Sequence, residues 1–289
     1  MQRPPREAGI EVADWTWKVV RAFARERFGI PLSRSSCLNY LHRLGFVVRR
    51  PKKRLLKADA AKRAAFVERY ATLRAEAGAT GAKHFFVDEA HFSADADLRG
   101  TWVLKGEPAL VGSTSPRYGE EASYYAAVCV ETGEVEAMPL AGNSSAETSA
   151  AFLRQLRAHH TEPLVVFWDN APAHSGDPLR AYLATPGLRL QLVRLPAYSP
   201  DFNAAEPLRD WVRDEVTANT CFGTAAKVRA HVDPFFAGLA ARAEAVRQRC
   251  RTASQAKADA LDAVSAATTI LQESQHATHA DGDPTLALV

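Results

Sequence analysis

Residues 164–174 read Leu-Val-Val-Phe-Trp-Asp-Asn-Ala-Pro-Ala-His, five apolar residues followed directly by a carboxylate. A continuous apolar run of this length is typical of a strand that is buried on both faces. Asp169 stands where that strand would end, and an unpaired carboxylate at such a place is costly to bury. The stretch therefore predicts a central strand of a sheet with an acidic group at its carboxyl end.

The sequence around this strand predicts an α/β domain with a mixed sheet, because several strands come first and helices then alternate with strands. A turn at Glu131-Thr132-Gly133 indicates a hairpin. The other expected strands are 84–89, 101–104, 109–112, 123–130, 134–140 and 188–195, and the expected helices are 145–160, 178–183 and 203–216.

Two further acids stand at comparable places. Asp88 ends the first apolar run, His84–Glu89, and Glu206 lies near the start of the last helix. Each acid alone is more simply explained as a cap, a turn residue or a surface charge. Together with Asp169 they are the oxygen ligands that Mg²⁺ prefers. Two such ions, about 3.5–4 Å apart, would suit phosphodiester chemistry.

The net charge of +3 hides an uneven distribution. Residues 1–57 contain 14 Lys+Arg and 4 Asp+Glu, a balance of +10, and the remainder contains 22 basic and 29 acidic residues, a balance of −7. A small basic domain is the usual electrostatic footprint of nucleic-acid binding. A solvated basic surface without a partner explains the charge alone equally well.

The basic segment predicts two helices joined by a short turn. The first is expected over residues 11–28, and Ser33 is a good N-cap for the second, which Gly45 would end. A short strand is expected at 46–48. This order is typical of a helix-turn-helix, whose second helix enters the major groove; an ordinary helical hairpin with a basic tail is the alternative. The candidate DNA-binding residues are Arg34, Ser35, Ser36, Asn39, His42, Arg43, Arg49, Arg50, Lys52, Lys53 and Arg54.

These patterns divide the chain into four parts. We expect a helix-turn-helix domain at 1–57, a connecting helix and linker at 58–82, the α/β domain at 83–250, and a helical, then disordered tail at 251–289. The four scattered cysteines favour free thiols over a zinc site. No apolar run reaches the roughly 18 residues of a membrane span and no secretory signal is evident, so a cytoplasmic protein is expected.

Three blocks carry a resemblance to a known family: FVDEAHF (86–92), FWDNAPAH (167–174) and LPAYSPDFNAAE (195–206). They resemble the signature blocks of Tc/mariner-type DDE transposases, in particular the bacterial insertion-sequence branch known as the insertion-sequence 630 family. The third block is the most specific. Asp169 and Glu206 are separated by 36 residues, which is close to the family's interval. The resemblance extends from about residue 11 to residue 250.

The resemblance implies an RNase H-like catalytic fold behind a plain or winged helix-turn-helix. It implies that Asp88, Asp169 and Glu206 are catalytic and bind two Mg²⁺ or Mn²⁺ ions, with Glu89, Asn170, His174 and Asn203 supporting them. Water would cleave a phosphodiester at a transposon end, and the freed 3′-hydroxyl would attack target DNA. The implied partners are double-stranded DNA and a second copy of the chain, in a bacterial cytoplasm on the nucleoid.

The sequence also departs from the family's pattern. Ala204-Ala205 replaces a common Pro-Ile, and Arg209 stands where a Trp usually follows the glutamate. A further helix-turn-helix common at the N-terminus of relatives is missing, so we expect a shortened copy. These departures leave a rival hypothesis, a catalytically impaired remnant that only binds DNA. A nuclease for RNA–DNA hybrids is a weaker third hypothesis, because it would not need the helix-turn-helix.

Overall fold

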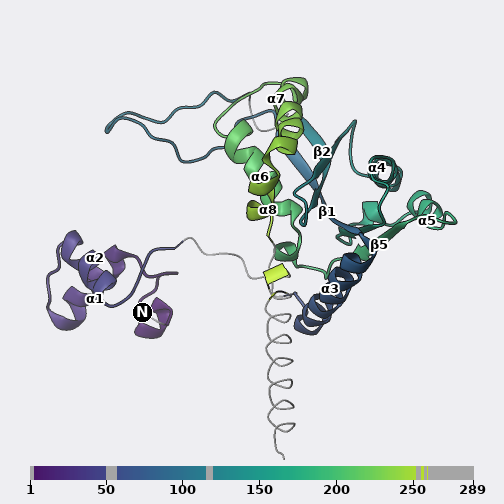
Figure 1. Ribbon diagram of the computed structural model, residues 1–289. Helices are drawn as coiled ribbons and strands as arrows, with labels where there is room; N and C mark the ends of the chain where they lie inside the picture. Colours follow the sequence, from purple (N-terminus) through teal and green to yellow (C-terminus); the bar gives the residue numbers. More distant parts are fainter. Residues whose placement is uncertain (1–2, 50–56, 115–119, 252–254, 257–258, 260–289) are drawn as a thin grey trace, which may run out of the picture. The chain divides into compact units, whose positions relative to one another are not determined.

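The computed structural model describes residues 3–49, 57–114, 120–251, 255–256 and 259 (Figure 1). The chain forms two compact units, and the division between them falls between residues 54 and 55. Among the described residues, no helix has both the length and the apolar character that crossing a membrane requires. Most of the predicted tail lies outside the described residues, as do Arg50, Lys52, Lys53 and Arg54 of the basic run.

The first unit contains a 3₁₀ turn, Pro5–Ala8, and two helices, α1 (Trp17–Phe28) and α2 (Arg34–Arg43). The predicted N-cap is confirmed, since the Ser33 hydroxyl accepts a hydrogen bond from the Ser36 backbone N–H. Cys37 is buried where the helices meet, and its thiol lies 3.4 Å from the backbone oxygen of Trp17.

Two expectations for this unit are wrong. The first helix begins at Trp17, not at residue 11, because the Thr16 side chain caps it there and accepts a hydrogen bond from the Val19 N–H. Residues 46–48 form no strand; Val47 and Val48 are exposed and no strand is paired with them among the described residues. A strand needs a neighbouring strand with which to form backbone hydrogen bonds, and an apolar composition alone does not provide one.

The second unit is built on a five-stranded mixed sheet in the order β3-β2-β1-β4-β5. β1 pairs antiparallel with β2 and parallel with β4, and β4 pairs parallel with β5. This topology confirms the predicted α/β class and places β1 at the centre. The strands are β1 (Lys83–Ser93), β2 (Glu121–Cys129), β3 (Val135–Leu140), β4 (Leu164–Trp168) and β5 (Leu190–Arg194).

Helices cover both faces of this sheet and make two apolar clusters (Figure 1). One cluster joins the first face to α3, α6, α7 and α8, and the other joins the second face to α4 and α5. Every residue of β4 is buried, as the apolar run predicted. The helices are α3 (Ala60–Thr80), α4 (Ala146–His159), α5 (Asp177–Leu183), α6 (Ala205–Val212), α7 (Ala225–Gly238) and α8 (Ala243–Arg249).

The expected linker at 78–82 is mostly helix. α3 continues to Thr80 and ends at Gly81, whose φ is 66°. Phe66, Tyr70 and Leu73 bury one side of α3 in the first apolar cluster. The helix is therefore part of the core of the second unit and does more than connect two domains.

The predicted hairpin at 131–133 is confirmed, and it depends on its glycine. Gly133 has a φ of 78°, and a Cβ added there would lie 2.2 Å from the Ala243 backbone oxygen. The strands predicted at 101–104 and 109–112 are wrong. Their apolar residues are exposed, Trp102 completely so, except for the half-buried Val111, and no neighbouring strand among the described residues pairs with them.

Candidate active site

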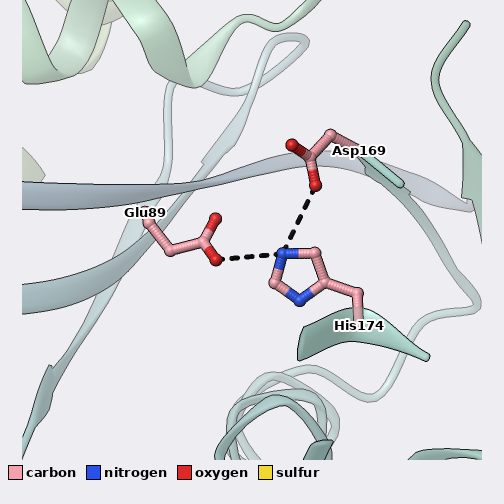
Figure 2. A group of neighbouring side chains, drawn as sticks. All are labelled: Glu89, Asp169 and His174. Carbon is pink, nitrogen blue, oxygen red and sulfur yellow. Dashed lines mark ion pairs between the residues drawn. The ribbon is translucent and has the colours of Figure 1, made fainter. Parts of the chain in front are cut away.

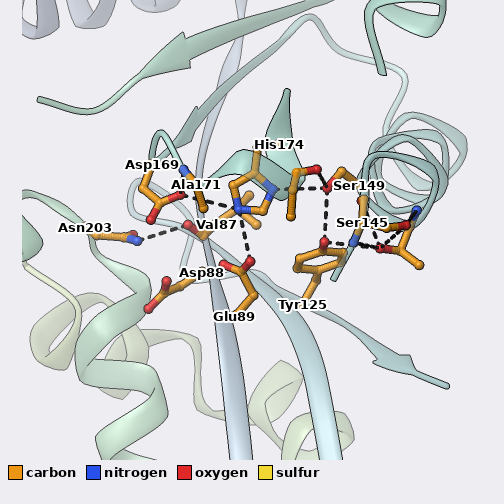
Figure 3. Close-up of polar contacts among 12 residues, drawn as sticks. Val87, Asp88, Glu89, Tyr125, Ser145, Ser149, Asp169, Ala171, His174 and Asn203 are labelled. Atoms are coloured by element: carbon orange, nitrogen blue, oxygen red, sulfur yellow. Dashed lines mark hydrogen bonds and ion pairs between the residues drawn. The ribbon is translucent and has the colours of Figure 1, made fainter. Parts of the chain in front are cut away.

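Asp88 and Asp169 meet because β1 and β4 are parallel neighbours. Phe86 is registered opposite Phe167, and each aspartate follows two residues later at the carboxyl end of the pair. Figure 3 shows both side chains at this edge of the sheet. The carboxyl ends of parallel strands are where α/β folds place their ligand sites.

Glu206 is brought to the same edge by the turn before α6. The Asn203 side-chain amide donates a hydrogen bond to the Val87 backbone oxygen at 3.0 Å, and its side-chain oxygen accepts from the Ala205 N–H at 3.1 Å. Asn203 thus fixes the start of α6 to the residue before Asp88. Glu206 stands in the first turn of that helix, and its side chain is partly exposed, as is that of Asp169.

The surroundings of Asp88 strongly shift its pKa. Its Oδ2 is buried and has no hydrogen-bond partner among the described residues; a guanidinium nitrogen of Arg209 lies 3.7 Å away, at ion-pair distance. Burial, and after it the negative charge of Glu206, raises the pKa of Asp88 to about 8, although Arg209 opposes the shift. Without a further cation, this carboxyl group is therefore mostly protonated at neutral pH.

A second group gathers around His174, on the 3₁₀ turn Pro172–His174 that follows β4. Figure 2 shows its imidazole between two carboxylates: Nε2 lies 3.1 Å from a Glu89 oxygen and 3.4 Å from an Asp169 oxygen. These are ion-pair distances without hydrogen-bond alignment. Ligand atoms of all three residues lie within 4.8 Å of one another. Burial alone would raise the pKa of Glu89, but interactions with His174 and Ser144 outweigh it and lower the pKa.

The core fixes the orientation of the His174 ring. The Ser149 hydroxyl donates its single proton to the Ala173 backbone oxygen at 3.0 Å, so it accepts from Nδ1–H of His174, also at 3.0 Å. The Tyr125 hydroxyl lies 3.0 Å from the same Ser149 hydroxyl (Figure 3). Trp168 stacks on the imidazole, with ring centroids 4.1 Å apart. This arrangement places Nδ1–H toward the core and directs Nε2 at Glu89 and Asp169.

The structure brings the seven residues proposed from the sequence to one edge of the sheet, in an unexpected grouping. Asp169 belongs to the ligand-atom group with Glu89 and His174, whereas Asp88 and Glu206 share Arg209. Asn170 supports the backbone, because its amide donates to the Leu195 oxygen at 2.8 Å.

Sequence reasoning missed two supporting side chains. Arg194 at the end of β5 donates to the backbone oxygens of Asp169, at 2.8 Å, and His174. Ser149 lies inside α4, in a segment that carries no chemical motif. A basic residue at the end of a predicted strand was a weak signal for Arg194, whereas nothing in the sequence distinguished Ser149.

Six of the candidate DNA-binding residues lie on α2, and Arg49 is exposed in the segment after it, outside any helix or strand. Arg34, Ser35, Asn39, His42 and Arg43 are exposed on α2, whereas Cys37 is buried. Ser36 differs, because its hydroxyl lies 2.9 Å from that of Ser33 and helps to cap the helix.

Comparison with known proteins gives two family matches. A model described as a DDE superfamily endonuclease matches residues 83–229, and one described as a winged helix-turn helix matches residues 11–70. No curated protein was found to match the chain.

The fold is similar to that of solved Mos1 transposase structures. A pre-cleavage Mos1 transpososome has a TM-score of 0.58 at 15% identity, with 88% of this chain and 84% of that chain covered. A mariner Mos1 paired end complex with Mg has a TM-score of 0.57 at 16% identity, with 85% and 82% covered. At such identities the likeness establishes the fold, which is RNase H-like as expected.

The endonuclease match spans just over half of the 289 residues and contains the three carboxylates at the sheet edge. The chain therefore belongs to the DDE superfamily of endonucleases.

Proposed function

We propose that this protein is a DNA transposase of the bacterial insertion-sequence branch of the Tc/mariner group, the insertion-sequence 630 family. The observation that carries the proposal is the convergence of Asp88, Asp169 and Glu206, one from each signature block, at a single edge of the sheet. Similar solved structures include a Mos1 strand transfer complex and a Mos1 transposase paired-end complex with the left transposon end. DNA cleavage and strand transfer are the corresponding reactions of this chain.

The donor set fits a divalent cation. The buried Asp88 oxygen lacks a hydrogen-bond partner among the described residues, and acidic groups surround it. Asp88, Asp169 and Glu206 would hold Mg²⁺ or Mn²⁺, two ions in all, because carboxylate oxygens are the ligands these ions prefer. When bound, such ions stabilise charge on the phosphate and lower the pKa of the attacking water. Solved Mos1 paired end complexes contain Mn or Mg.

The protein's own groups position these acids. His174 fixes Glu89 and Asp169 from the core side, and Asn203 fixes the turn that carries Glu206. Asp88 must release the proton it holds near neutral pH before both of its oxygens can bind a cation. Cleavage uses water and strand transfer uses the freed 3′-hydroxyl, so neither step needs a covalent enzyme intermediate.

The first unit would supply DNA recognition. Arg34, Asn39 and Arg43 are exposed on α2, and such side chains can read guanine and adenine edges in the major groove. Arg49 and the basic residues after it suit phosphates, which position a protein without reading sequence. The partner is double-stranded DNA in a bacterial cytoplasm. Joining two ends requires two sites, so we include a homodimer on DNA in the proposal.

One observation favours the rival, a DNA-binding protein with impaired catalysis. Arg209 contacts both Asp88 and Glu206 and so partly neutralises two of the three proposed ligands. The rival predicts DNA binding without cleavage at any Mg²⁺ or Mn²⁺ concentration.

The test is cleavage of DNA that carries the inverted repeats flanking this reading frame. Wild-type protein should nick the repeat ends only with Mg²⁺ or Mn²⁺, and Asp169→Asn should reduce the rate by at least about a thousandfold, as for loss of an essential catalytic group. Gel shifts should show equal DNA affinity for both proteins. Unchanged cleavage by Asp169→Asn would contradict the proposed site, and binding without cleavage by the wild-type protein would favour the rival.

A further inference from the structure

Arg209 lies between two of the carboxylates to which the proposed function assigns a cation. It stands one helical turn after Glu206 on α6, so both side chains extend from the same face of the helix. One guanidinium nitrogen contacts the Glu206 carboxylate, and the other lies 3.7 Å from Oδ2 of Asp88. A single positive group thus bridges an acid on β1 and an acid on α6.

The charges around Arg209 explain why it takes this position. Asp88 is buried and receives negative potential from Glu206, Glu89 and Asp169. His174 lies at ion-pair distance from Glu89 and Asp169. Among the described residues, Arg209 is the cationic side chain that contacts Asp88. Neighbouring acids raise the pKa of a buried carboxyl group, and a nearby cation lowers it. In the absence of a metal ion, the Arg209 guanidinium is the positive group that lowers the pKa of Asp88, against burial and the neighbouring acids that raise it.

The bridge is also replaceable. Nε of Arg209 is buried without a hydrogen-bond partner among the described residues, so the side chain loses one hydrogen bond by staying in the site. The side chain is about a quarter exposed and therefore has a route to water, where that N–H would be solvated. A guanidinium carries one positive charge at every accessible pH, whereas a divalent ion brings two.

We propose that Arg209 is an internal cation that occupies the position between Asp88 and Glu206 in the metal-free protein, and that a divalent ion must displace it. Arg209 would thereby determine how tightly the site binds metal. The inference rests on the proposed function, since it takes Asp88 and Glu206 to be metal ligands. It differs from the rival above, because a displaceable arginine weakens metal binding without abolishing catalysis.

The test measures Mn²⁺ binding to the full chain without DNA, by titration calorimetry and by the electron paramagnetic resonance signal of free Mn²⁺. Arg209→Gln removes the charge and should tighten Mn²⁺ binding at least about tenfold, and Arg209→Met, which keeps the length of the side chain, should behave alike. Arg209→Lys should stay close to the wild type, because it keeps a positive charge. Arg213→Gln is the matched control: Arg213 follows on the next turn, pairs with Asp97 and Asp210, and should leave the affinity unchanged.

The outcomes separate the inference from the proposed function. Equal or weaker Mn²⁺ binding by folded Arg209→Gln and Arg209→Met, with binding still lost in Asp169→Asn, would overturn the role of Arg209 and leave the metal site standing. A lack of Mn²⁺ binding at millimolar concentration in the wild type and in both neutral variants would overturn both. Far-UV circular dichroism identifies folded variants, and two different neutral replacements keep the test decisive if one of them fails to fold.

Discussion

The two halves of the candidate active site hold their acids in different ways. In the histidine half, Glu89 and Asp169 face His174, a fully buried ring tied to α4 through Ser149. In the arginine half, Asp88 and Glu206 face Arg209, a partly exposed side chain to which the described residues offer no such tie from the core. One half is therefore positioned by the core, whereas the other contains the charged side chain that, on our proposal, a metal ion displaces.

Removing the central group of each half should have very different effects on stability. His174→Ala leaves a cavity beside Trp168 and removes the imidazole that contacts two carboxylates, and should cost about 3 kcal/mol or more of unfolding free energy. Arg209→Ala should cost less than about 1 kcal/mol, because its contacts are partly exposed. Urea denaturation at pH 7 without metal measures both. Similar costs for the two variants would remove the distinction between the halves.

The tie between His174 and the core can be tested through Ser149. Ser149→Ala removes the acceptor of Nδ1–H and should cost about 2 kcal/mol, because a buried donor is left unpaired. Nitrogen NMR of labelled histidine should show that His174 loses its fixed Nδ1–H form.

Ser145→Ala is the matched control, since it removes the N-cap of the same helix without touching the histidine. It should reduce stability by about 1 kcal/mol and leave the His174 signals in place. If Ser149→Ala leaves those signals equally unchanged, the serine does not hold the ring.

The raised pKa of Asp88, in the arginine half, should make the stability of the protein depend on pH. The pKa of Asp88 is about 8 in the folded chain and near 3.8 when unfolded, so the folded state holds an extra proton between these values. Stability contributed by this group is therefore lost as the pH rises from about 4 to about 8. Asp88→Asn cannot ionise, so its unfolding free energy relative to wild type should increase by at least about 1 kcal/mol over that window in metal-free buffer.

Asp210→Asn, an exposed change on α6, is the control for this pH effect and should show no such trend. A constant difference between Asp88→Asn and wild type from pH 4 to pH 9 would mean that Asp88 ionises normally in the folded chain.

The sequence predicted the sheet edge well because its signals are local. The apolar run 164–168 indicated a buried strand, and Asp88 and Asp169 stand at positions that the parallel register of β1 and β4 brings together. Glu206 reaches the same edge through the turn before α6. The same local reasoning failed at 101–104 and 109–112, where apolar residues lie exposed without a ladder partner among the described residues. Strand formation depends on pairing with a neighbouring strand, which a short stretch of sequence does not contain.

The division of the site into two halves could not be predicted from the sequence. Ser149 and Tyr125 lie on other elements, far along the chain from His174, and act only through the packing of α4 and β2 against the end of β4. Arg209 stands out in the sequence only as a departure from the family's pattern. Its ion pairs with Asp88 and Glu206 became visible only once α6 was placed against β1.

The most direct test of the account is a crystal structure of the full chain soaked with Mn²⁺, with the ion located by its anomalous scattering. The account predicts a Mn²⁺ peak bonded to Asp88, Asp169 and Glu206, with Arg209 withdrawn toward solvent and Nδ1 of His174 still bonded to Ser149. A peak bonded to Glu89 and His174 with Arg209 still bridging Asp88 and Glu206, or no peak at saturating Mn²⁺, would contradict it.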